Sequence, residues 1–440
     1  MSAGDRRTTS ETVAWRQGRE QAPAQAQAHD QALQRAAAEM PRHVRPGTLQ
    51  LRALPPLALY VHLPWCLRKC PYCDFNSHAW RDGRADIPEA RYVAALLQDL
   101  EASLPLVWGR SLRSVFLGGG TPSLFSPRAI DDLLAGIRAR LRLAADAEIT
   151  LEANPGTFER QRFADYAQAG VNRLSIGVQS FDDHMLQRLG RVHDSAQACA
   201  AIEEAARVVP SFNIDLMFAL PGQSLRQAQQ ELERALAFDP PHLSLYQLSI
   251  EPQTAFARRP PPGLPQADLA ADMQQALALQ AEAAGLQRYE VSAYCRPAHA
   301  SRHNTNYWEF GDYLGIGAGA HSKLSFAHRV LRQTRHAQPA RYMELAALGQ
   351  AVDVEHEVAR SELPFEFLLN ALRLRRGFDP RSYAERTGLA PSSLQPGLDK
   401  AVELGLLEST PTCIRATERG WDMLNDVLQL FLPPAAGGLE

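Results

Sequence analysis

The feature that most constrains the fold is a repeated alternation of strand-like and helix-like segments between residues 57 and 250. Short apolar runs typical of buried strands occupy 58–63, 114–117, 148–153, 173–178, 213–218 and 242–250. Longer segments with helical spacing lie between them, at 89–104, 127–141, 196–208 and 225–238. Strands joined by helical crossovers run parallel in one sheet. The alternation therefore predicts an α/β fold whose parallel sheet curls into a partial or complete barrel.

Polar, glycine or proline residues follow five successive expected strands, which predicts a single ligand site. A cysteine-rich loop follows the first strand, Gly118 to Thr121 the second, Asn154 the third, Gln179 the fourth and Pro221 the fifth. Ligands gather at the carboxyl ends of parallel strands. We therefore expect these segments to meet around a bound cofactor.

The cysteine-rich loop carries Cys66, Cys70 and Cys73 and is typical of an iron–sulfur ligand loop. Three thiolates can bind three irons of a [4Fe–4S] cluster, which leaves the fourth iron open to a small molecule. A zinc site is an alternative, with His62 or His78 completing the ligand set, although no second ligand pair follows at the usual spacing. A disulfide would leave one thiol over, and inert buried cysteines rarely adjoin basic residues.

Charged and amide side chains at the other strand ends predict a pocket for a polar nucleoside. Glu152 and Asp215 end apolar strands, where a buried carboxylate is costly unless it is paired or bound to a ligand. Gln179 and Arg191 add amide and guanidinium donors. The run Gly118 to Thr121 permits close backbone approach to a ligand. The alternative is an ion-pair network among these side chains.

Composition excludes several classes of protein. With 440 residues and a formal charge of -3, the chain shows no field suited to nucleic acid or an anionic membrane. No run of 18 apolar residues exists, so we expect no membrane span, and the first 30 residues lack the apolar segment of a secretory signal. Six cysteines, three of them in one loop, do not form a disulfide framework. We expect a reducing cytoplasmic location.

The chain divides into three expected parts: a flexible Ala- and Gln-rich tail at 1–55, the barrel at 56–335, and a mainly helical domain at 336–440. Short helices are expected at 365–373, 380–387, 392–404 and 421–430. The spacing at 380–407, followed by a possible wing at 407–416, is typical of a winged-helix nucleic-acid module. Acidic residues such as Glu385 and Asp399 interrupt any basic stripe, so we expect a lid or a partner-docking role instead.

These motifs together resemble the radical S-adenosylmethionine superfamily, and within it the oxygen-independent coproporphyrinogen III oxidase group. The resemblance implies a partial (β/α)₆ barrel with a winged-helix-like C-terminal domain, and it covers about residues 57–430. It implies that Cys66, Cys70 and Cys73 bind the cluster while S-adenosylmethionine chelates the open iron. The remaining implied cofactor contacts are Tyr60, Tyr72, Gly119, Gly120, Thr121, Glu152, Gln179, Arg191 and Asp215.

Two positions favour a haem-chaperone branch of that group over the oxidase. The oxidase has a further cysteine two residues beyond the third, where this chain has Phe75. The run from His303 to Trp308 matches the His-Asn-x-x-Tyr-Trp signature of the chaperone branch, which implies that His303 is an axial haem ligand. An isolated histidine beside a Tyr-Trp pair is otherwise a packing residue.

The resemblance thus implies transfer of haem to an acceptor protein, possibly membrane-associated, with an electron donor for the cluster. Whether the chain turns over S-adenosylmethionine stays open. The alternatives are an oxidase acting on a porphyrinogen and a zinc-stabilised scaffold.

Overall fold

The computed structural model describes residues 49–80, 87–156 and 160–433, and its centre is one mixed sheet of twelve strands. Six neighbouring strands run parallel in the order β1-β4-β5-β6-β7-β8. Their bounds are β1 (Leu57–Leu63), β4 (Ser111–Gly119), β5 (Arg142–Ala153), β6 (Arg173–Gln179), β7 (Ser211–Phe218) and β8 (His242–Gln247). They are the six predicted strands, so the predicted α/β parallel sheet is confirmed. The sheet stays open, with β14 and β9 at its two edges.

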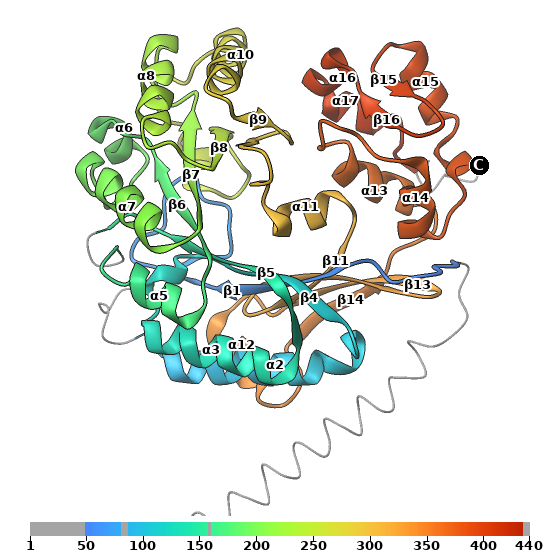
Figure 1. The fold of residues 1–440 in the computed structure, drawn as a ribbon, viewed down its shortest axis with the longest axis horizontal. Helices are drawn as coiled ribbons and strands as arrows, with labels where there is room; N and C mark the ends of the chain where they lie inside the picture. Colours follow the sequence, from blue (N-terminus) through green and yellow to red (C-terminus); the bar gives the residue numbers. More distant parts are fainter. Residues whose placement is uncertain (1–48, 81–86, 157–159, 434–440) are drawn as a thin grey trace, which may run out of the picture.

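Helices follow the strands and cover the outer face of the sheet (Figure 1). They are α2 (Glu89–Val107), α3 (Pro127–Arg140), α5 (Phe163–Ala169), α6 (Asp183–Arg188), α7 (Ser195–Val208), α8 (Leu225–Leu236) and α10 (Ala267–Ala283). Local sequence determines where several of them begin. The side chains of Ser126, Asp194 and Ser224 each accept a backbone N–H bond at a helix N-terminus, and the last two form capping boxes.

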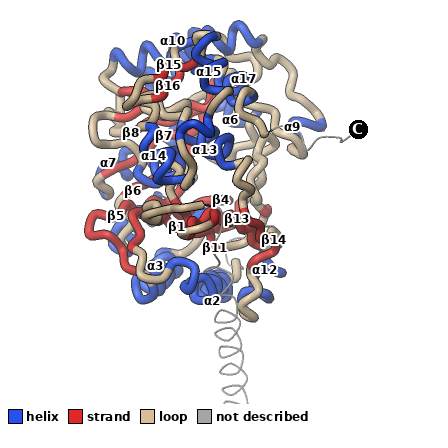
Figure 2. The backbone as a smooth tube through the Cα atoms, turned by 90° about the vertical axis from the view of Figure 1, so that its right-hand side faces the viewer, coloured by secondary structure: helices blue, strands red, loops and turns tan. Residues whose placement is uncertain are grey.

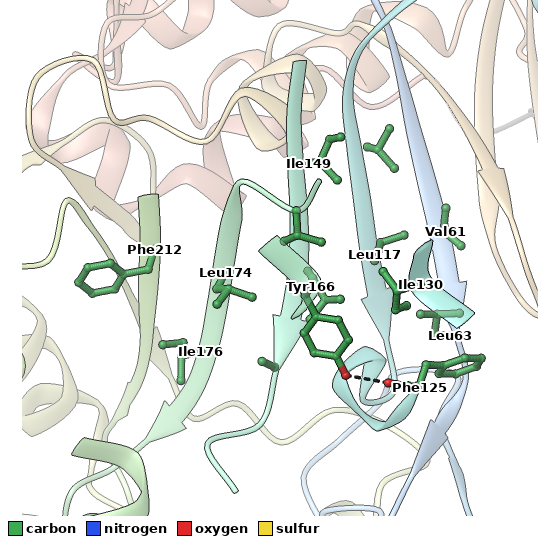
Figure 3. Close-up of a cluster of buried hydrophobic side chains, with 14 of the residues drawn as sticks. Val61, Leu63, Leu117, Phe125, Ile130, Ile149, Tyr166, Leu174, Ile176 and Phe212 are labelled. Carbon is green, nitrogen blue, oxygen red and sulfur yellow. Dashed lines mark hydrogen bonds between the residues drawn. The ribbon is translucent and has the colours of Figure 1, made fainter. Parts of the chain in front are cut away.

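Alternate residues of the parallel strands have opposite character, and this alternation separates the core from the site. One set is apolar and packs under the helices. Figure 3 shows Val61, Leu117, Ile149 and Leu174 of this set. It also shows Tyr166 of α5, which donates a hydrogen bond to the Phe125 carbonyl. The other set is largely polar and points into the curl of the sheet. We call this inner space the lumen. Its polar lining cannot form a core, so it leaves room for ligands.

The sheet extends beyond the parallel strands at both sides. Strand β11 (Asp312–Ile316) lies parallel to β1, and it is followed by the antiparallel strands β12 (His321–Phe326), β13 (Arg329–Arg335) and β14 (Val352–Glu357). At the other side β10 (Ala293–Cys295) and β9 (Gln287–Arg288) pair antiparallel. The segment expected to be mainly helical, 336–440, also contains strand β14, which the sequence did not single out. Five of its six residues are exposed, so its pairing with β13 identifies it as a strand.

The C-terminal segment forms a second core of helices with a small hairpin. Its elements are α13 (Leu363–Ala371), α14 (Pro380–Thr387), α15 (Gly397–Glu403), β15 (Leu407–Ser409), β16 (Ile414–Ala416), α16 (Glu418–Asp422) and α17 (Leu424–Gln429). The hairpin occupies the segment predicted as a wing. Figure 2 shows these helices on the side of the sheet opposite α2, α3 and α12 (Pro339–Ala346).

Residues near the start of the described chain belong to this second core. Leu49 and Leu51 are buried in it, and the Leu51 N–H donates to the Ala327 carbonyl. The rest of the expected tail, residues 1–48, lies outside the described residues. Within the described ranges, no helix has both the length and the apolar character needed to cross a bilayer.

Candidate functional site

The lumen contains a cavity of about 950 Å³ that extends along the parallel strands to their carboxyl ends, and we call that end of the cavity its mouth. It is lined by all thirteen side chains or glycines predicted as site residues: Tyr60, Cys66, Cys70, Tyr72, Cys73, Gly119, Gly120, Thr121, Glu152, Gln179, Arg191, Asp215 and His303. The structure therefore brings them together, although residue 60 and residue 303 are 243 positions apart in the sequence. Which ligand each one contacts stays a prediction.

The cysteine loop runs between two very short strands, β2 (Trp65–Cys66) and β3 (His78–Ala79), whose parallel pairing closes it. The three thiols are partly buried and none forms a disulfide. Each has a different polar neighbour. The Thr121 hydroxyl lies 3.5 Å from the Cys66 sulfur, the Arg191 guanidinium 3.7 Å from that of Cys70, and the Ser77 hydroxyl 3.6 Å from that of Cys73.

The surroundings of Cys66 favour a neutral thiol in the absence of a bound cation. Burial raises the pKa of the Cys66 thiol to about 11, against the opposing effects of the Thr121 hydrogen bond and the Arg191 charge. A metal that binds a thiol removes its proton. Among the described residues, no three His, Cys, Asp or Glu side chains form a site for a single metal ion. The thiolates of a [4Fe–4S] cluster bind different irons and need no such common point.

A residue that the sequence did not single out, Asn76, anchors the loop to the rest of the fold. Its side-chain amide donates to the carbonyls of Ala318 and Ala337, at 2.9 and 2.8 Å. Its backbone carbonyl lies 2.8 Å from His62 Nε2, and its amide oxygen lies 3.1 Å from His78 Nε2. The two histidines considered as zinc ligands are thus engaged with Asn76. No sequence pattern reveals this contact, because it joins segments 242 and more residues apart.

Close packing against neighbouring protein atoms requires glycine at positions 119 and 120. Gly119 has a left-handed φ of 112°, and a Cβ there would lie 2.5 Å from the His62 ring. A Cβ on Gly120 would lie 2.6 Å from the Trp65 carbonyl oxygen. The absence of side chains at these two positions lets the end of β4 lie directly against the start of the cysteine loop. The Gly119 N–H donates to Glu152 Oε2 at 3.1 Å, which connects the glycines to the acidic part of the cavity.

Two carboxylates face the cavity without a cationic partner. Burial, together with the nearby Asp215, raises the pKa of Glu152 to about 7, against the opposing effect of the Gly119 hydrogen bond. Burial also raises the pKa of Asp215, whose oxygens accept hydrogen bonds from Asn213 at 2.7 Å and Ser175 at 3.1 Å. Arg191 donates instead to Asn154 Oδ1 and the Gly177 carbonyl, at 2.6 and 2.8 Å. The ion-pair network considered from sequence is therefore absent from the described residues.

The remaining cofactor candidates are held at the mouth of the cavity. Gln179 ends β6 with a left-handed φ of 67°, which is uncommon for a residue with a Cβ and costs energy that the surroundings must supply. The Tyr60 hydroxyl lies 3.0 Å from His62 Nδ1, and Tyr72 packs against Phe256. The Nε of Arg191 is buried and has no hydrogen-bond partner among the described residues. A charged ligand bound beside a cluster fits these groups: thiols outside any disulfide, the unpartnered Nε of Arg191 and the Glu152 carboxyl with its raised pKa.

His303 lies deeper in the lumen, on α11 (Arg302–Trp308). Its ring stacks on Phe116 with the centroids 4.9 Å apart. Nδ1 lies 2.9 Å from the Ser114 hydroxyl, and Nε2 lies 3.2 Å from the Tyr307 hydroxyl. Burial lowers the pKa of His303 to about 3, so the ring is neutral and suited to bind a metal. Both ring nitrogens are already hydrogen-bonded, however, so an iron at Nε2 must displace the Tyr307 hydroxyl.

The far end of α11 contacts the C-terminal domain. The Arg373 guanidinium lies over the Trp308 ring, 4.3 Å from its centroid, and Arg376 forms an ion pair with Glu309. Phe310 packs edge-on against Phe367 of α13. The helix that carries His303 therefore connects the lumen to the second core.

Comparisons with known proteins agree with this architecture. The model of the radical SAM superfamily matches residues 60–235, and that of the HemN C-terminal domain matches residues 358–423. The chain is 48% identical over 381 residues to the heme chaperone HemW of Escherichia coli K12, covering 86% of this chain and 99% of the relative. It is 44% identical over 385 residues to the heme chaperone HemW of Haemophilus influenzae, covering 86% and 98%.

Among solved structures, the chain resembles the coproporphyrinogen III oxidase HemN of Escherichia coli, with a TM-score of 0.73 and 24% identity. The match covers 86% of this chain and 90% of that one. At this identity the likeness shows a shared fold.

Proposed function

Because the chain belongs to the radical S-adenosylmethionine superfamily and, within it, to the heme chaperone HemW family, we propose that it binds haem and transfers it to an acceptor protein. The superfamily implies a [4Fe–4S] cluster and S-adenosylmethionine. The observation that carries the proposal is the convergence of the cysteine loop, the polar strand ends and His303 on one cavity. A scaffold protein would not need unpaired charges along that cavity.

At the mouth of the cavity, the three cysteines would bind the cluster, and S-adenosylmethionine would occupy the remaining iron. Bound there, the cluster supplies one-electron chemistry, for which an electron donor is needed. Tyr60 and Tyr72 would flank the cofactor. Its methionine part would lie against Gly119, Gly120 and Thr121, and Glu152, with its pKa near neutrality, would hydrogen-bond a ribose hydroxyl. Gln179, Arg191 and Asp215 would supply the other polar contacts.

Deeper in the lumen, His303 would bind the haem iron through Nε2 as a neutral imidazole. Ser114 would keep Nδ1 hydrogen-bonded and so hold the ring in place. The contacts of α11 with the C-terminal domain make that domain a suitable place for the acceptor to dock, since an acceptor there would be close to the ligand helix. We expect this exchange to take place in the reducing cytoplasm, with a membrane-associated acceptor.

The test is an anaerobic haem titration of the cluster-reconstituted protein and of two variants. His303→Ala should lose the saturable Soret change seen near one equivalent, and the exposed His184→Ala on α6 should keep it. Iron and sulfide contents should be equal in all three proteins, which separates loss of haem from loss of the cluster. An unchanged affinity in His303→Ala would remove this residue as the ligand. Absence of saturable binding in the unaltered protein would contradict the chaperone proposal.

The alternative is an oxidase that acts on a porphyrinogen with the same cofactors. One position weighs against it: Phe75, which lines the cavity and is 59% exposed, stands where the oxidase has a further cysteine. Anaerobic incubation with coproporphyrinogen, reductant and S-adenosylmethionine would distinguish the two functions. Formation of protoporphyrinogen would favour the oxidase.

A further inference from the structure

The amino-terminal end of the lumen, which we call the floor, contains a buried guanidinium that forms no ion pair or hydrogen bond with a described residue. Arg173 is 4% exposed and lines the cavity. No ion pair or hydrogen bond to a described residue involves its side chain, and its Nε is buried without a partner. Beside it in the sheet register lies Thr150, which is fully buried and whose Oγ1 also lacks a partner among the described residues. An unpaired buried charge costs several kcal/mol, so this arrangement indicates a missing anion.

The carboxyl of Asp215 is near enough for the Arg173 charge to lower its pKa, but the two side chains form no ion pair. Asp215, on the neighbouring strand, is four residues beyond Ser211, the register partner of Arg173. Its carboxylate is already hydrogen-bonded by Ser175 and Asn213. The imidazole of His242, also on the floor, is engaged with Asn213 and Tyr289, and burial lowers its pKa so that it stays neutral. The Arg173 guanidinium therefore keeps a buried Nε–H donor that neither side chain uses.

The position of Arg173 separates it from the expected cofactor contacts. Arg173 is the first residue of β6 and Gln179 is the last, so the two lie about 20 Å apart along the strand. The floor instead adjoins His303, whose ring is sensitive to the Arg173 charge. A guanidinium in a dry site binds a carboxylate through two parallel hydrogen bonds, and the cavity volume lies at the upper end of the range for small-molecule sites.

We propose that Arg173 binds a propionate carboxylate of the tetrapyrrole whose iron is held by His303. This assignment rests on the proposed haem function. Binding of the propionate neutralises the floor, and Thr150 adds a hydroxyl donor beside the guanidinium. Arg173 thereby distinguishes a tetrapyrrole with free acid groups from one whose acid groups are masked.

The experiment compares haem with haem dimethyl ester, which keeps the iron and the ring but has no propionate charge. Both are titrated into the cluster-reconstituted protein and into Arg173→Gln, Arg173→Lys and Arg140→Gln. The last is a matched control, because Arg140 bonds Glu101 on the outer helices, away from the cavity. Arg173→Gln should bind haem roughly 10- to 100-fold more weakly and bind the ester as the unaltered protein does, since charged hydrogen bonds contribute about 1.5–3 kcal/mol. Arg173→Lys should recover part of the haem affinity.

Several outcomes would overturn the assignment. Equal losses for haem and ester, or no loss for either, would mean that Arg173 does not bind the propionate. A loss of S-adenosylmethionine affinity in place of haem affinity would assign Arg173 to the cofactor. The melting temperature of ligand-free protein gives a further check, with Arg335→Gln as the reference, because Arg335 forms a buried ion pair with Asp99. An equally large fall in Arg173→Gln would mean that the Arg173 guanidinium is already compensated by the fold.

A separate arm distinguishes failure of this subsite from failure of the proposed function. If the unaltered protein binds neither haem nor the ester, the chaperone proposal fails. Thermal melts in sodium propionate and in sodium chloride of equal ionic strength then decide on the subsite. A higher melting temperature in propionate that Arg173→Gln abolishes would retain a carboxylate site for another ligand. Equal melting temperatures in the two salts would overturn the subsite as well.

Discussion

Two groups of buried charges in this molecule differ in how completely the protein satisfies them. Between α2 and β13, Arg335 is fully buried, and its guanidinium bonds Asp99, Ser103, Ser322 and Gln333 at 2.9 to 3.3 Å. In the lumen, Arg173 is nearly as buried and has no such hydrogen-bonded partner in the described chain, and neither Glu152 nor Asp215 forms an ion pair with a described residue. Burial alone therefore does not mark a functional charge. The number of partners that the fold provides does so.

The hydrogen-bonded group around Arg335 and Asp99 stabilises the backbone that lies next to it. Tyr342 donates a hydrogen bond to Asp99 at 2.9 Å, and its hydroxyl accepts the Gly317 N–H at 3.0 Å. Tyr92 similarly accepts from the Ala318 N–H and donates to the His62 carbonyl, both at 2.8 Å. This group thus supports the glycine-rich segment on which the cysteine loop is anchored. It requires no ligand to be stable.

The largest expected effect follows from breaking the satisfied group. Arg335→Gln leaves the Asp99 carboxylate buried without its cation, and we expect a loss of about 3–5 kcal/mol in the free energy of unfolding. Urea denaturation followed by circular dichroism measures it. Arg140→Gln, which removes a partly exposed ion pair, should change the unfolding free energy by no more than about 1 kcal/mol. Equal effects of the two substitutions would mean that the buried pair stabilises the fold no more than a partly exposed pair does.

The next effect concerns the pH dependence caused by Glu152. Its pKa of about 7 in the folded protein exceeds the ordinary value of 4.5, so the folded state retains a proton that the unfolded state releases. Stability from this group is therefore complete below about pH 4.5 and is lost as the pH rises through 7, by up to about 3 kcal/mol. Glu152→Gln should lack this loss. Unfolding midpoints of the ligand-free proteins at pH 5 and pH 8 test it, and identical pH dependence in both proteins would contradict it.

The smallest effect concerns the hydrogen bond between Tyr307 and His303. Tyr307→Phe removes the hydroxyl that occupies His303 Nε2, so an iron no longer has to displace it. We expect haem to bind about fivefold more tightly, which corresponds to about 1 kcal/mol. Tyr383→Phe, which removes a hydroxyl bonded to Ser393 in the C-terminal domain, is the control. Weaker haem binding in Tyr307→Phe would mean that the hydroxyl supports the ligand.

The parallel strands and the site residues at their ends were predictable because both depend on local pattern. Short apolar runs bounded by glycine, proline and polar residues identify the strands, and the strand-end rule then places Glu152 and Gln179 at one cavity. Strand β14 was not predictable, because its polar sequence becomes a strand only through pairing with β13. The roles of Asn76 and Arg173 were hidden for a related reason. One depends on contacts between distant segments, and the other on the absence of a partner, which a sequence does not reveal.

The close packing at Gly119 has a consequence for the substitutions that this chain tolerates. The position carries no functional group, yet a single methyl there meets the His62 ring, and His62 in turn holds the Asn76 carbonyl of the cysteine loop. A displacement of His62 would therefore pass to the loop through one hydrogen bond. Residue 119 is thus constrained both by the space around it and by its left-handed backbone conformation. The tolerance of the iron-binding segment to mutation is determined in part by a strand that contributes no ligand to it.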